Sequence, residues 1–218
     1  MIFLFIILVI TPLYGQISEN ELLGKINPIT HPDFIKIKSN GKFFWLRTEV
    51  AVKYEEMAED AKREGIDLFI VSAFRSFEDQ KNIWEYKNKK YSYLSKQERV
   101  KKILEYSSMP GTSRHHWGTD IDLVSVNPSF FDSFEGKKIF NWLTNNASKY
   151  GFFMPYSSGR TNGFKVEKWH WSYKPIAEKF LIEYTNKIKY EDLSGFFGSE
   201  LAEELKIFEN YVLNISFD

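Results

Sequence analysis

Two short stretches of the chain hold residues that could bind one metal ion together. The first, SRHHWGTDID, places His115 and Asp122 seven residues apart. The second, EKWH, adds His170 and, three residues before it, Glu167. Two histidines and one aspartate are three protein ligands for zinc, and three ligands plus an open position for water is the arrangement of catalytic zinc sites. These residues therefore predict a single Zn²⁺ ion with hydrolytic chemistry.

A zinc ion bound in this way acidifies water, lowering its pKa towards about 7. Glu167 is then the candidate general base, because a carboxylate three residues before a ligand can reach that water without binding the metal. His116 competes with His115 as the ligand from the first stretch. A purely structural role for the histidines also stays open, because the two stretches are far apart in the chain.

Arg75 is a further candidate for chemistry. It lies in the segment SAFRS, directly after the short apolar run LFIV, so we expect it to leave a buried strand beside the site. A guanidinium group binds a carboxylate through two parallel hydrogen bonds, and a peptide with a free C-terminal carboxylate would supply that partner. The alternative is an arginine that ties a local loop to an internal aspartate.

Hydrophobic periodicity predicts the helices that surround these residues. Apolar residues recur at three- and four-residue spacing in residues 46–64, with charged residues between them, and Gly65 follows as a stop signal. Ser76 is a suitable N-cap for the next helix, whose first turn is acidic. The predicted helices are residues 46–64, 76–86, 95–106, 136–150, 175–190 and 199–211.

Short strands are predicted between the helices, at residues 67–72, 119–124, 151–154 and 166–173. Alternation in the second of them puts Asp120 and Asp122 on the polar face, where a metal ion could reach them. In the last strand, strict alternation puts Glu167 and His170 on opposite faces. A β-bulge, or a site that the strand enters edge-on, would be needed to bring both side chains to one metal ion.

The remaining segments are expected to be irregular. Residues 16–40 contain two prolines and are predicted to form an extended lead-in, with His31 as a surface residue outside the site. Residues 156–163, which carry glycine and serine, are predicted to form a loop at the rim of a cleft. The basic cluster in residues 87–106 is interpreted as a solvated helix face.

Composition limits the classes of function. The 218 residues include 29 basic and 29 acidic side chains, so a formal net charge of zero gives no electrostatic reason to expect a nucleic-acid partner. Cysteine is absent, which excludes disulfides and thiolate ligands for the metal. The length suits one domain with its own hydrophobic core, and nothing in the sequence indicates an oligomeric state.

The N-terminus predicts export. Residues 1–10 are all apolar, but this run is too short to span a bilayer, which takes roughly 20 residues. It fits the apolar part of a secretory signal cleaved near Gly15, so no membrane span is expected after cleavage; a buried strand or an uncleaved anchor is the alternative. The expected division is a signal peptide over 1–15, a lead-in over 16–45, a catalytic domain over 46–190 and a helical extension over 191–218.

Three motifs, taken together, resemble those of a known family of zinc peptidases. SRHHWGTDID resembles the SxHxxGxAxD motif of D-alanyl-D-alanine carboxypeptidases of the VanY type. EKWH resembles their ExxH motif, and SAFRS resembles their SGYRS segment. The resemblance extends over roughly residues 46–173, with the motifs in the family's order.

For the metal site, the resemblance implies the same residues as the spacing does. The family's zinc ligands match His115, Asp122 and His170, and its catalytic base matches Glu167. One position departs from the motif, because Asp120 stands where the family has a small residue. Asp120 could orient a ligand histidine, as metal sites commonly need, or alter which peptide fits.

For the substrate, the resemblance implies three further residues and a fold. Arg75 matches an arginine that binds the substrate carboxylate and stabilises the transition state. Ser113 matches a serine that lines the site, and Gln80 matches a polar position near the substrate cleft. The implied fold is α+β and VanY/hedgehog-like, with helices packed against a small antiparallel sheet that carries the zinc site.

The implied activity is that of an exported zinc carboxypeptidase acting on peptidoglycan stem peptides in the periplasm or cell envelope of a bacterium, with D,D- and L,D-specificity both open. One alternative is an endopeptidase that cuts cross-links and needs no terminal carboxylate. Another is a non-catalytic wall-binding module of the same fold. The presence of Glu167 beside the three ligands argues against that module, which has no use for a base.

Overall fold

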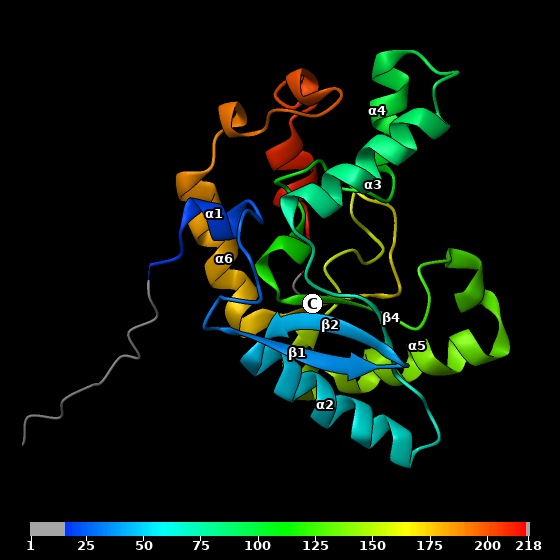
Figure 1. The fold of residues 1–218 in the computed structure, drawn as a ribbon. Helices are drawn as coiled ribbons and strands as arrows, with labels where there is room; N and C mark the ends of the chain where they lie inside the picture. The colour runs from blue at the N-terminus through cyan, green and yellow to red at the C-terminus, as the bar shows by residue number, and fades with distance from the viewer. Residues whose placement is uncertain (1–15, 217–218) are drawn as a thin grey trace, which may run out of the picture.

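Two antiparallel sheets organise the chain in the computed structural model, which describes residues 16–216 (Figure 1). One sheet is the hairpin of β1 and β2, and the other has the strand order β3–β4–β6–β5 with antiparallel neighbours. The strands are β1 (Phe34–Ser39), β2 (Lys42–Arg47), β3 (Ile70–Ser72), β4 (Asp120–Leu123), β5 (Phe152–Phe153) and β6 (His170–Tyr173). The predicted α+β class with a small antiparallel sheet is confirmed.

Helices pack against these sheets, with α2 along the hairpin and α3 and α4 at the other end of the molecule (Figure 1). The helices are α1 (Glu19–Leu22), α2 (Thr48–Arg63), α3 (Phe77–Lys90), α4 (Lys96–Leu104), α5 (Phe134–Asn146) and α6 (Lys174–Lys187). The last five confirm predicted helices to within a few residues. Ser76 caps α3 as expected, accepting from the amide of Asp79 at 3.1 Å.

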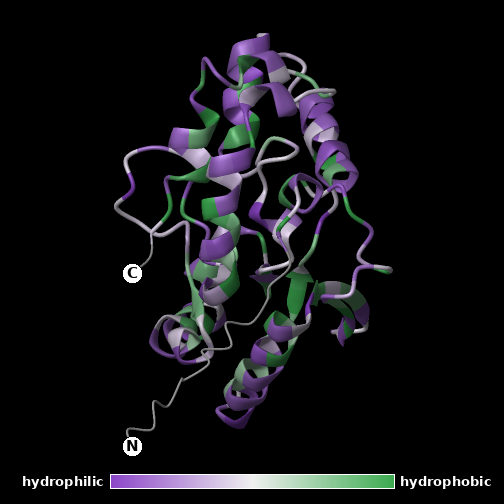
Figure 2. Ribbon diagram, turned by 90° about the vertical axis from the view of Figure 1, so that its left-hand side faces the viewer, coloured by the Kyte–Doolittle hydropathy of each residue, from purple (hydrophilic) through white to green (hydrophobic). Residues whose placement is uncertain are grey.

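The buried apolar side chains form two clusters. One cluster joins α2 and α5 to the sheets, and the other joins α1, α3, α4, α6 and the C-terminal segment. Along the outer helices, purple residues alternate with green ones, as expected for helices with one buried face (Figure 2). The central motif connects the clusters, because Trp117 belongs to the second and Ile121 to the first.

The expected extended lead-in is wrong, because residues 16–40 contain α1 and β1. The chain turns from β1 into β2 at Asn40 and Gly41, which both have a positive φ, and such a pair forms the tight turn that hairpins favour. His31 is half-buried and lies 3.3 Å from a carboxylate oxygen of Glu21, so it is not a free surface residue. The predicted signal peptide, residues 1–15, lies outside the described residues.

The predicted helix over residues 199–211 is also wrong. The segment contains the short 3-10 helix η5 (Ser199–Leu201), turns over residues 202–206 and the π-helix η6 (Phe208–Val212). Lys206 has a φ of 50°, a left-handed conformation that interrupts a continuous helix. None of the helices between residues 16 and 216 combines the length and hydropathy that crossing a bilayer needs.

Candidate active site

His115 lies in the short 3-10 helix η1 (Arg114–Trp117), which ends at Gly118. Gly118 has a φ of 70°, and a Cβ there would lie 2.5 Å from the ring of Phe34, so the backbone conformation and the available space both require glycine. The Arg75 amide donates to the His115 carbonyl at 3.2 Å. These contacts fix the turn that carries the His115 ring.

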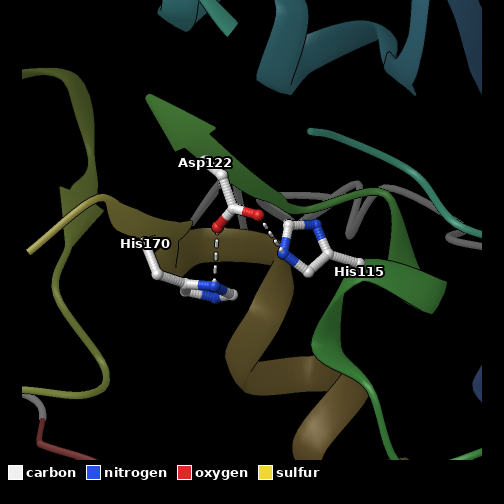
Figure 3. A group of neighbouring side chains, drawn as sticks. All are labelled: His115, Asp122 and His170. Atoms are coloured by element: carbon white, nitrogen blue, oxygen red, sulfur yellow. Dashed lines mark ion pairs between the residues drawn. The ribbon is translucent and has the colours of Figure 1, made fainter. Parts of the chain in front are cut away.

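Asp122 and His170 lie opposite each other on the neighbouring strands β4 and β6. Asp122 Oδ1 is 3.1 Å from His170 Nδ1, and Asp122 Oδ2 is 3.3 Å from His115 Nε2. Figure 3 shows the carboxylate between the two rings, with one oxygen directed at each. All three residues are buried. The structure thus brings the three predicted ligands together from distant parts of the chain.

Each imidazole has a hydrogen bond on the side away from Asp122. His115 Nδ1 is 2.8 Å from the Ala73 carbonyl oxygen, which can only accept, so this nitrogen carries the proton of the neutral ring. His170 Nε2 is 2.9 Å from Asp120 Oδ1 and carries a proton for the same reason. In the neutral rings, His115 Nε2 and His170 Nδ1 therefore direct lone pairs at the Asp122 carboxylate.

Acceptor atoms that face one another in this way fit a cation between them. His115 Nε2 and Asp122 Oδ1 are buried and have no hydrogen-bond partner among the described residues. The nitrogen–oxygen separations of 3.1 and 3.3 Å match the roughly 3.3 Å expected between two ligands of a tetrahedral zinc ion. Two imidazoles and one carboxylate are also a donor set that zinc accepts. The residues therefore fit a zinc ion.

The carboxylates control the protonation of the two rings. Burial disfavours charge on His170, but its interactions with Asp120 and Asp122 outweigh burial and raise the pKa of His170 to about 9. Burial and the nearby charge of Arg75 lower the pKa of His115. Burial alone would raise the pKa of Asp122, yet the imidazoles hold it well below its usual range. A metal ion entering the site has to displace the His170 proton.

Glu167 lies in a turn before β6 and not within the strand. The His170 amide donates to the Glu167 carbonyl, and the Glu167 amide donates to the Tyr156 carbonyl, both at 3.1 Å. This turn brings Glu167 Oε2 to 3.7 Å from His170 Nδ1, so both side chains reach the site without a β-bulge. The strand predicted over residues 166–173 is therefore too long, since β6 begins at His170.

The environment of Glu167 changes its acidity. Burial raises the pKa of Glu167 to about 8, with a further contribution from the charge of Asp122, while His170, Arg75 and Lys87 oppose the shift. A carboxyl group with a pKa near neutrality can take up and release a proton at neutral pH, which is what a general base has to do.

Arg75 lies on the wall of the same site, after β3. Its Nη1 donates to the side-chain oxygen of Gln80 at 2.9 Å, and its buried Nε has no hydrogen-bond partner among residues 16–216. Gln80 is completely buried and donates to the Ser108 carbonyl at 2.7 Å. Gln80 therefore lies behind Arg75 and holds it, and does not line the cavity where a substrate contact was expected.

The cavity at the site is small. Its volume is about 20 Å³, room for roughly one water molecule. The predicted residues on its wall are Arg75, Ser113, His115, Glu167 and His170. Asp122 is not on the wall.

Comparison with known proteins identifies the family. The sequence profile of VanY, described as D-alanyl-D-alanine carboxypeptidase, matches residues 44–176. The chain belongs to the VanY family. The matched region contains all of the predicted site residues, from Arg75 to His170, and ends just inside α6. The segment that follows α6, with η5 and η6, lies outside the match.

Two curated relatives extend the comparison over more of the chain. The putative carboxypeptidase YodJ of Bacillus subtilis is 30% identical over 161 residues, which are 66% of this chain and 55% of the relative. A D-alanyl-D-alanine carboxypeptidase of Enterococcus faecium is 26% identical over 192 residues, which are 85% of this chain and 56% of the relative. This chain therefore spans little more than half the length of these relatives.

Solved structures share the VanY fold. A mutant of a vancomycin-resistance D,D-pentapeptidase VanY, solved with Zn(II), has a TM-score of 0.56 at 22% identity and covers 71% of this chain and 86% of its own. The LD-carboxypeptidase LdcB has a TM-score of 0.54 at 23% identity and covers 75% of this chain and 77% of its own. At sequence identities of 22% and 23%, these similarities show a shared fold and no more.

His116, the competing ligand, has both ring nitrogens occupied elsewhere. Its Nδ1 donates to the Arg75 carbonyl at 2.7 Å, and its Nε2 accepts from the Gly111 amide at 3.1 Å. Burial lowers the pKa of His116 to about 3. His116 therefore connects the VanY motif to the loop before α3 and faces away from the other predicted ligands.

Sequence reasoning missed several residues around the cavity. Tyr156 and Phe164 lie on its wall, and the Tyr156 ring packs 4.8 Å from the His170 ring. Lys87, interpreted as part of a solvated face, is half-buried and donates to Ser107 on the wall at 2.5 Å. The loop predicted over residues 156–163 does reach the cleft, but no local pattern distinguishes its wall residues from other loop aromatics.

Proposed function

We propose that this chain is an exported, zinc-dependent carboxypeptidase that removes the terminal D-amino acid from peptidoglycan stem peptides. VanY family membership and two relatives described as carboxypeptidases support the reaction class. The fold neighbours VanYB, solved with D-alanine-D-alanine, and LdcB, described for peptidoglycan recognition, support the substrate class. The catalytic unit is taken as residues 46–190, preceded by a signal peptide over residues 1–15.

The observation that carries the proposal is the set of acceptor atoms converging on one point. His115, Asp122 and His170 would hold one zinc ion through ligand atoms that lie within 4.8 Å of one another. When bound, zinc supplies Lewis acidity, which acidifies water and polarises the carbonyl of the scissile bond. The remaining steps fall to the residues on the cavity wall.

Glu167 is proposed to move the proton. It takes the proton from the attacking water on a carboxylate oxygen and passes it to the nitrogen of the leaving D-amino acid as the C–N bond breaks. Its position 3.7 Å from the metal-facing nitrogen of His170 supports this role, because it is near the site without belonging to the ligand group. In the metal-free chain, burial raises the pKa of Glu167 to about 8, which makes its carboxylate a stronger base than an exposed one.

Arg75 is proposed to bind the terminal carboxylate of the substrate or the developing oxyanion. The buried, unpartnered Nε supports this role, because a guanidinium group in a wall needs an anionic partner. Gln80 holds the group in place, and Ser113 lines the cavity beside it. An endopeptidase substrate would bring no terminal carboxylate to Arg75, so this arrangement favours a carboxypeptidase over an endopeptidase.

We also propose that part of the wall moves when a substrate binds. A cavity of about 20 Å³ is far smaller than a dipeptide, which needs more than the space of one water molecule. Tyr156 and Phe164 belong to the segment between β5 and β6, and we propose that this segment opens to admit the peptide.

Mass spectrometry of stem peptides tests the proposal. The purified chain is incubated with a pentapeptide that has a free C-terminus, its C-terminal amide, and a version ending in L-alanine, each with and without a chelator. We expect loss of one residue chiefly from the free D-terminal peptide, with much slower cleavage of the amide and none of the L-alanine peptide; chelator should abolish cleavage and zinc should restore it. Cleavage that survives chelation, or equal cleavage of the amide, would contradict the mechanism.

A cross-linked dimer of stem peptides distinguishes the alternatives. Cleavage of the cross-link in place of the terminal bond would identify an endopeptidase. Zinc binding without cleavage of any peptide would identify a wall-binding module. Export is tested separately by N-terminal sequencing of the protein from the cell envelope, where a mature N-terminus near Gln16 is expected.

A further inference from the structure

Asp120 is a completely buried carboxylate, and one of its partners is the predicted ligand His170. Its Oδ1 accepts from His170 Nε2 at 2.9 Å and from Arg114 Nε at 3.0 Å. Its Oδ2 accepts from the hydroxyl groups of Ser172 at 3.0 Å and Thr119 at 2.5 Å. A carboxylate can accept about four hydrogen bonds, so these four contacts use all the acceptor sites of Asp120 and hold its side chain in one orientation.

Arg114 supplies the positive charge that compensates this burial. Its Nη2 donates to the Ser172 hydroxyl at 2.6 Å, and its guanidinium carbon lies 4.8 Å from the centre of the Trp117 ring. Burial would raise the pKa of Asp120, but the Arg114 charge and the His170 hydrogen bond hold it well below its usual range. The ion pair with Arg114 and the hydrogen bond to His170 direct Asp120 Oδ1 at His170 Nε2 as an acceptor.

The two predicted ligand histidines are thus oriented by different kinds of partner. His115 uses the backbone carbonyl of Ala73, which no side-chain substitution removes. His170 uses the side chain of Asp120. Position 120 holds a small residue in the motif that the chain otherwise matches, so the acid is a departure of this chain. Arg114 stands six residues before it, in the same stretch.

We propose that Asp120 and Arg114 act as a positioning pair, which fixes His170 with Nε2–H on Asp120 and Nδ1 toward the metal. Asp120 selects the tautomer and the ring orientation of His170, and Arg114 holds the Asp120 carboxylate in place through their ion pair. The inference rests on the proposed zinc site. The competing explanation is a buried ion pair that only ties η1 to β4 and β6, which would change stability but not metal affinity.

Paired variants separate these explanations. Removing one charge alone would leave the other buried without a partner, which is strongly destabilising, so both residues are changed together. Arg114→Met with Asp120→Ala removes the pair and the acceptor. Arg114→Met with Asp120→Asn removes the charges but keeps an oxygen that can accept from His170. The two double variants thus differ mainly in the hydrogen bond to His170.

The first measurement is the zinc dissociation constant of the full chain, from competition with a chromophoric chelator. We expect the Ala double variant to bind zinc about 10- to 100-fold more weakly than wild type, as is usual for lost partners of ligand histidines. We expect the Asn double variant to recover most of that loss. Equal affinity of the Ala double variant and wild type would overturn the proposal.

The second measurement is ¹⁵N NMR of the histidine rings in the zinc-loaded protein. We expect a slowly exchanging Nε2–H resonance from His170 in wild type and in the Asn variant, and its loss in the Ala variant. Retention of that resonance in the Ala variant would overturn the proposal. A wild-type protein that binds zinc but cleaves no stem peptide refutes the proposed function and leaves this test intact, whereas one that binds no zinc refutes both.

A matched pair of single substitutions covers the case in which a double variant fails to fold. Ser172→Ala removes one support of Asp120 without changing charge, and we expect several-fold weaker zinc binding. Ser39→Ala removes a buried serine from another polar cluster, where it contacts Tyr54 and the Ile70 amide at 3.0 Å. The Ser39 variant should lower the melting temperature and leave zinc affinity unchanged. Equal zinc affinity in both variants would contradict the positioning role.

Discussion

Two clusters in the described part of the chain have the composition of a metal site. In each, one possible ligand atom per residue lies within 4.8 Å of the others. The clusters are His115, Asp122 and His170 in the VanY motifs, and Glu21, His31 and Asp33 near the N-terminal end of the described chain. The first is buried, while the second is half-buried with an exposed aspartate. Their surroundings decide which one can hold a cation.

Arg47 already occupies the second cluster. Its Nη2 donates to Glu21 at 2.9 Å, and its Nη1 donates to Asp33 at 3.0 Å. His31 Nδ1 accepts from the Asp33 amide at 3.2 Å, which leaves the ring proton on Nε2, 3.3 Å from Glu21. Arg47 therefore already neutralises the carboxylates of Glu21 and Asp33, and His31 has no free lone pair for a metal ion.

The first cluster is arranged in the opposite way. Ala73 and Asp120 take the ring protons on the far sides of His115 and His170, so the free nitrogens face Asp122. Arg114, which lies in the same motif, pairs with Asp120 at 3.0 Å. The comparison teaches that residue types alone do not make a metal site. The hydrogen-bond partners around the cluster must also leave the ligand lone pairs pointing at its centre, and no arginine or lysine may already pair with its carboxylates.

The largest expected contrast comes from removing one histidine from each cluster. His115→Ala should abolish zinc binding and peptidase activity, because two ligands remain where a catalytic zinc site needs three. His31→Ala should retain one zinc ion per chain and near wild-type activity. Metal analysis after gel filtration and a peptide assay measure both. A second zinc ion in wild type that is lost in His31→Ala would break the comparison.

The next largest effect is expected at Glu167, where a substitution should impair proton transfer without impairing metal binding. Glu167→Gln should keep zinc but lower kcat by about 10²- to 10⁴-fold, the usual contribution of a general base. Glu21→Gln is the matched change in the second cluster and should leave kcat unaltered. Steady-state kinetics on the zinc-loaded variants measure this. Turnover of Glu167→Gln close to the wild-type rate would show that another group moves the proton.

Much of the metal-site cluster could be predicted from the sequence, because its features depend on residues that are close together in the chain. The His115 turn and Gly118 lie within one short motif, and strand alternation places Asp120 and Asp122 on the same face. Helix periodicity predicted α2 to α6 to within a few residues. These features depend on residues close in the chain, so pattern alone reveals them.

What the sequence missed depends on partners that are distant in the chain. The turn that brings Glu167 beside His170 is held by the Tyr156 carbonyl, a tertiary contact that alternation cannot anticipate. Gln80 was expected in the cleft, but its partner is Arg75. Arg114 gave no signal because a lone arginine beside a ligand looks like a surface residue. The identity of a buried hydrogen-bond partner is a property of the fold and not of spacing.

A comparison of Arg75, which lies in the cavity wall, with Arg47, which lies in the second cluster, gives the third test. Arg75→Met should lower kcat/KM for peptides with a free C-terminal carboxylate by about 100-fold, since it removes the partner of a desolvated charge. The effect on the amidated peptide, a poor substrate in any case, should be much smaller. Arg47→Met should lower the melting temperature without changing the ratio between the two peptides. An equal loss on both peptides in Arg75→Met would assign Arg75 to the oxyanion and not to the carboxylate.

The smallest expected effect is the pH dependence of stability when zinc has been removed by a chelator. The pKa of His170 is about 9 in the folded chain, against 6.5 for an unperturbed histidine, because Asp120 and Asp122 outweigh burial. Between these values the folded state holds a proton that the unfolded state has released, so raising the pH through this range favours unfolding.

The free energy of unfolding should therefore fall by on the order of 2 kcal/mol between pH 6.5 and 9, since each pKa unit is worth about 1.4 kcal/mol. Glu167, with its pKa raised to about 8 chiefly by burial, acts in the same direction. Zinc replaces the His170 proton, so the zinc-loaded protein should lose this dependence and bind zinc more tightly as the pH rises. Urea unfolding at each pH measures the effect, with His170→Gln as the control that should reduce it and leave the part due to Glu167. Stability that rises with pH in the chelated protein would mean that His170 does not hold a proton in place of the metal.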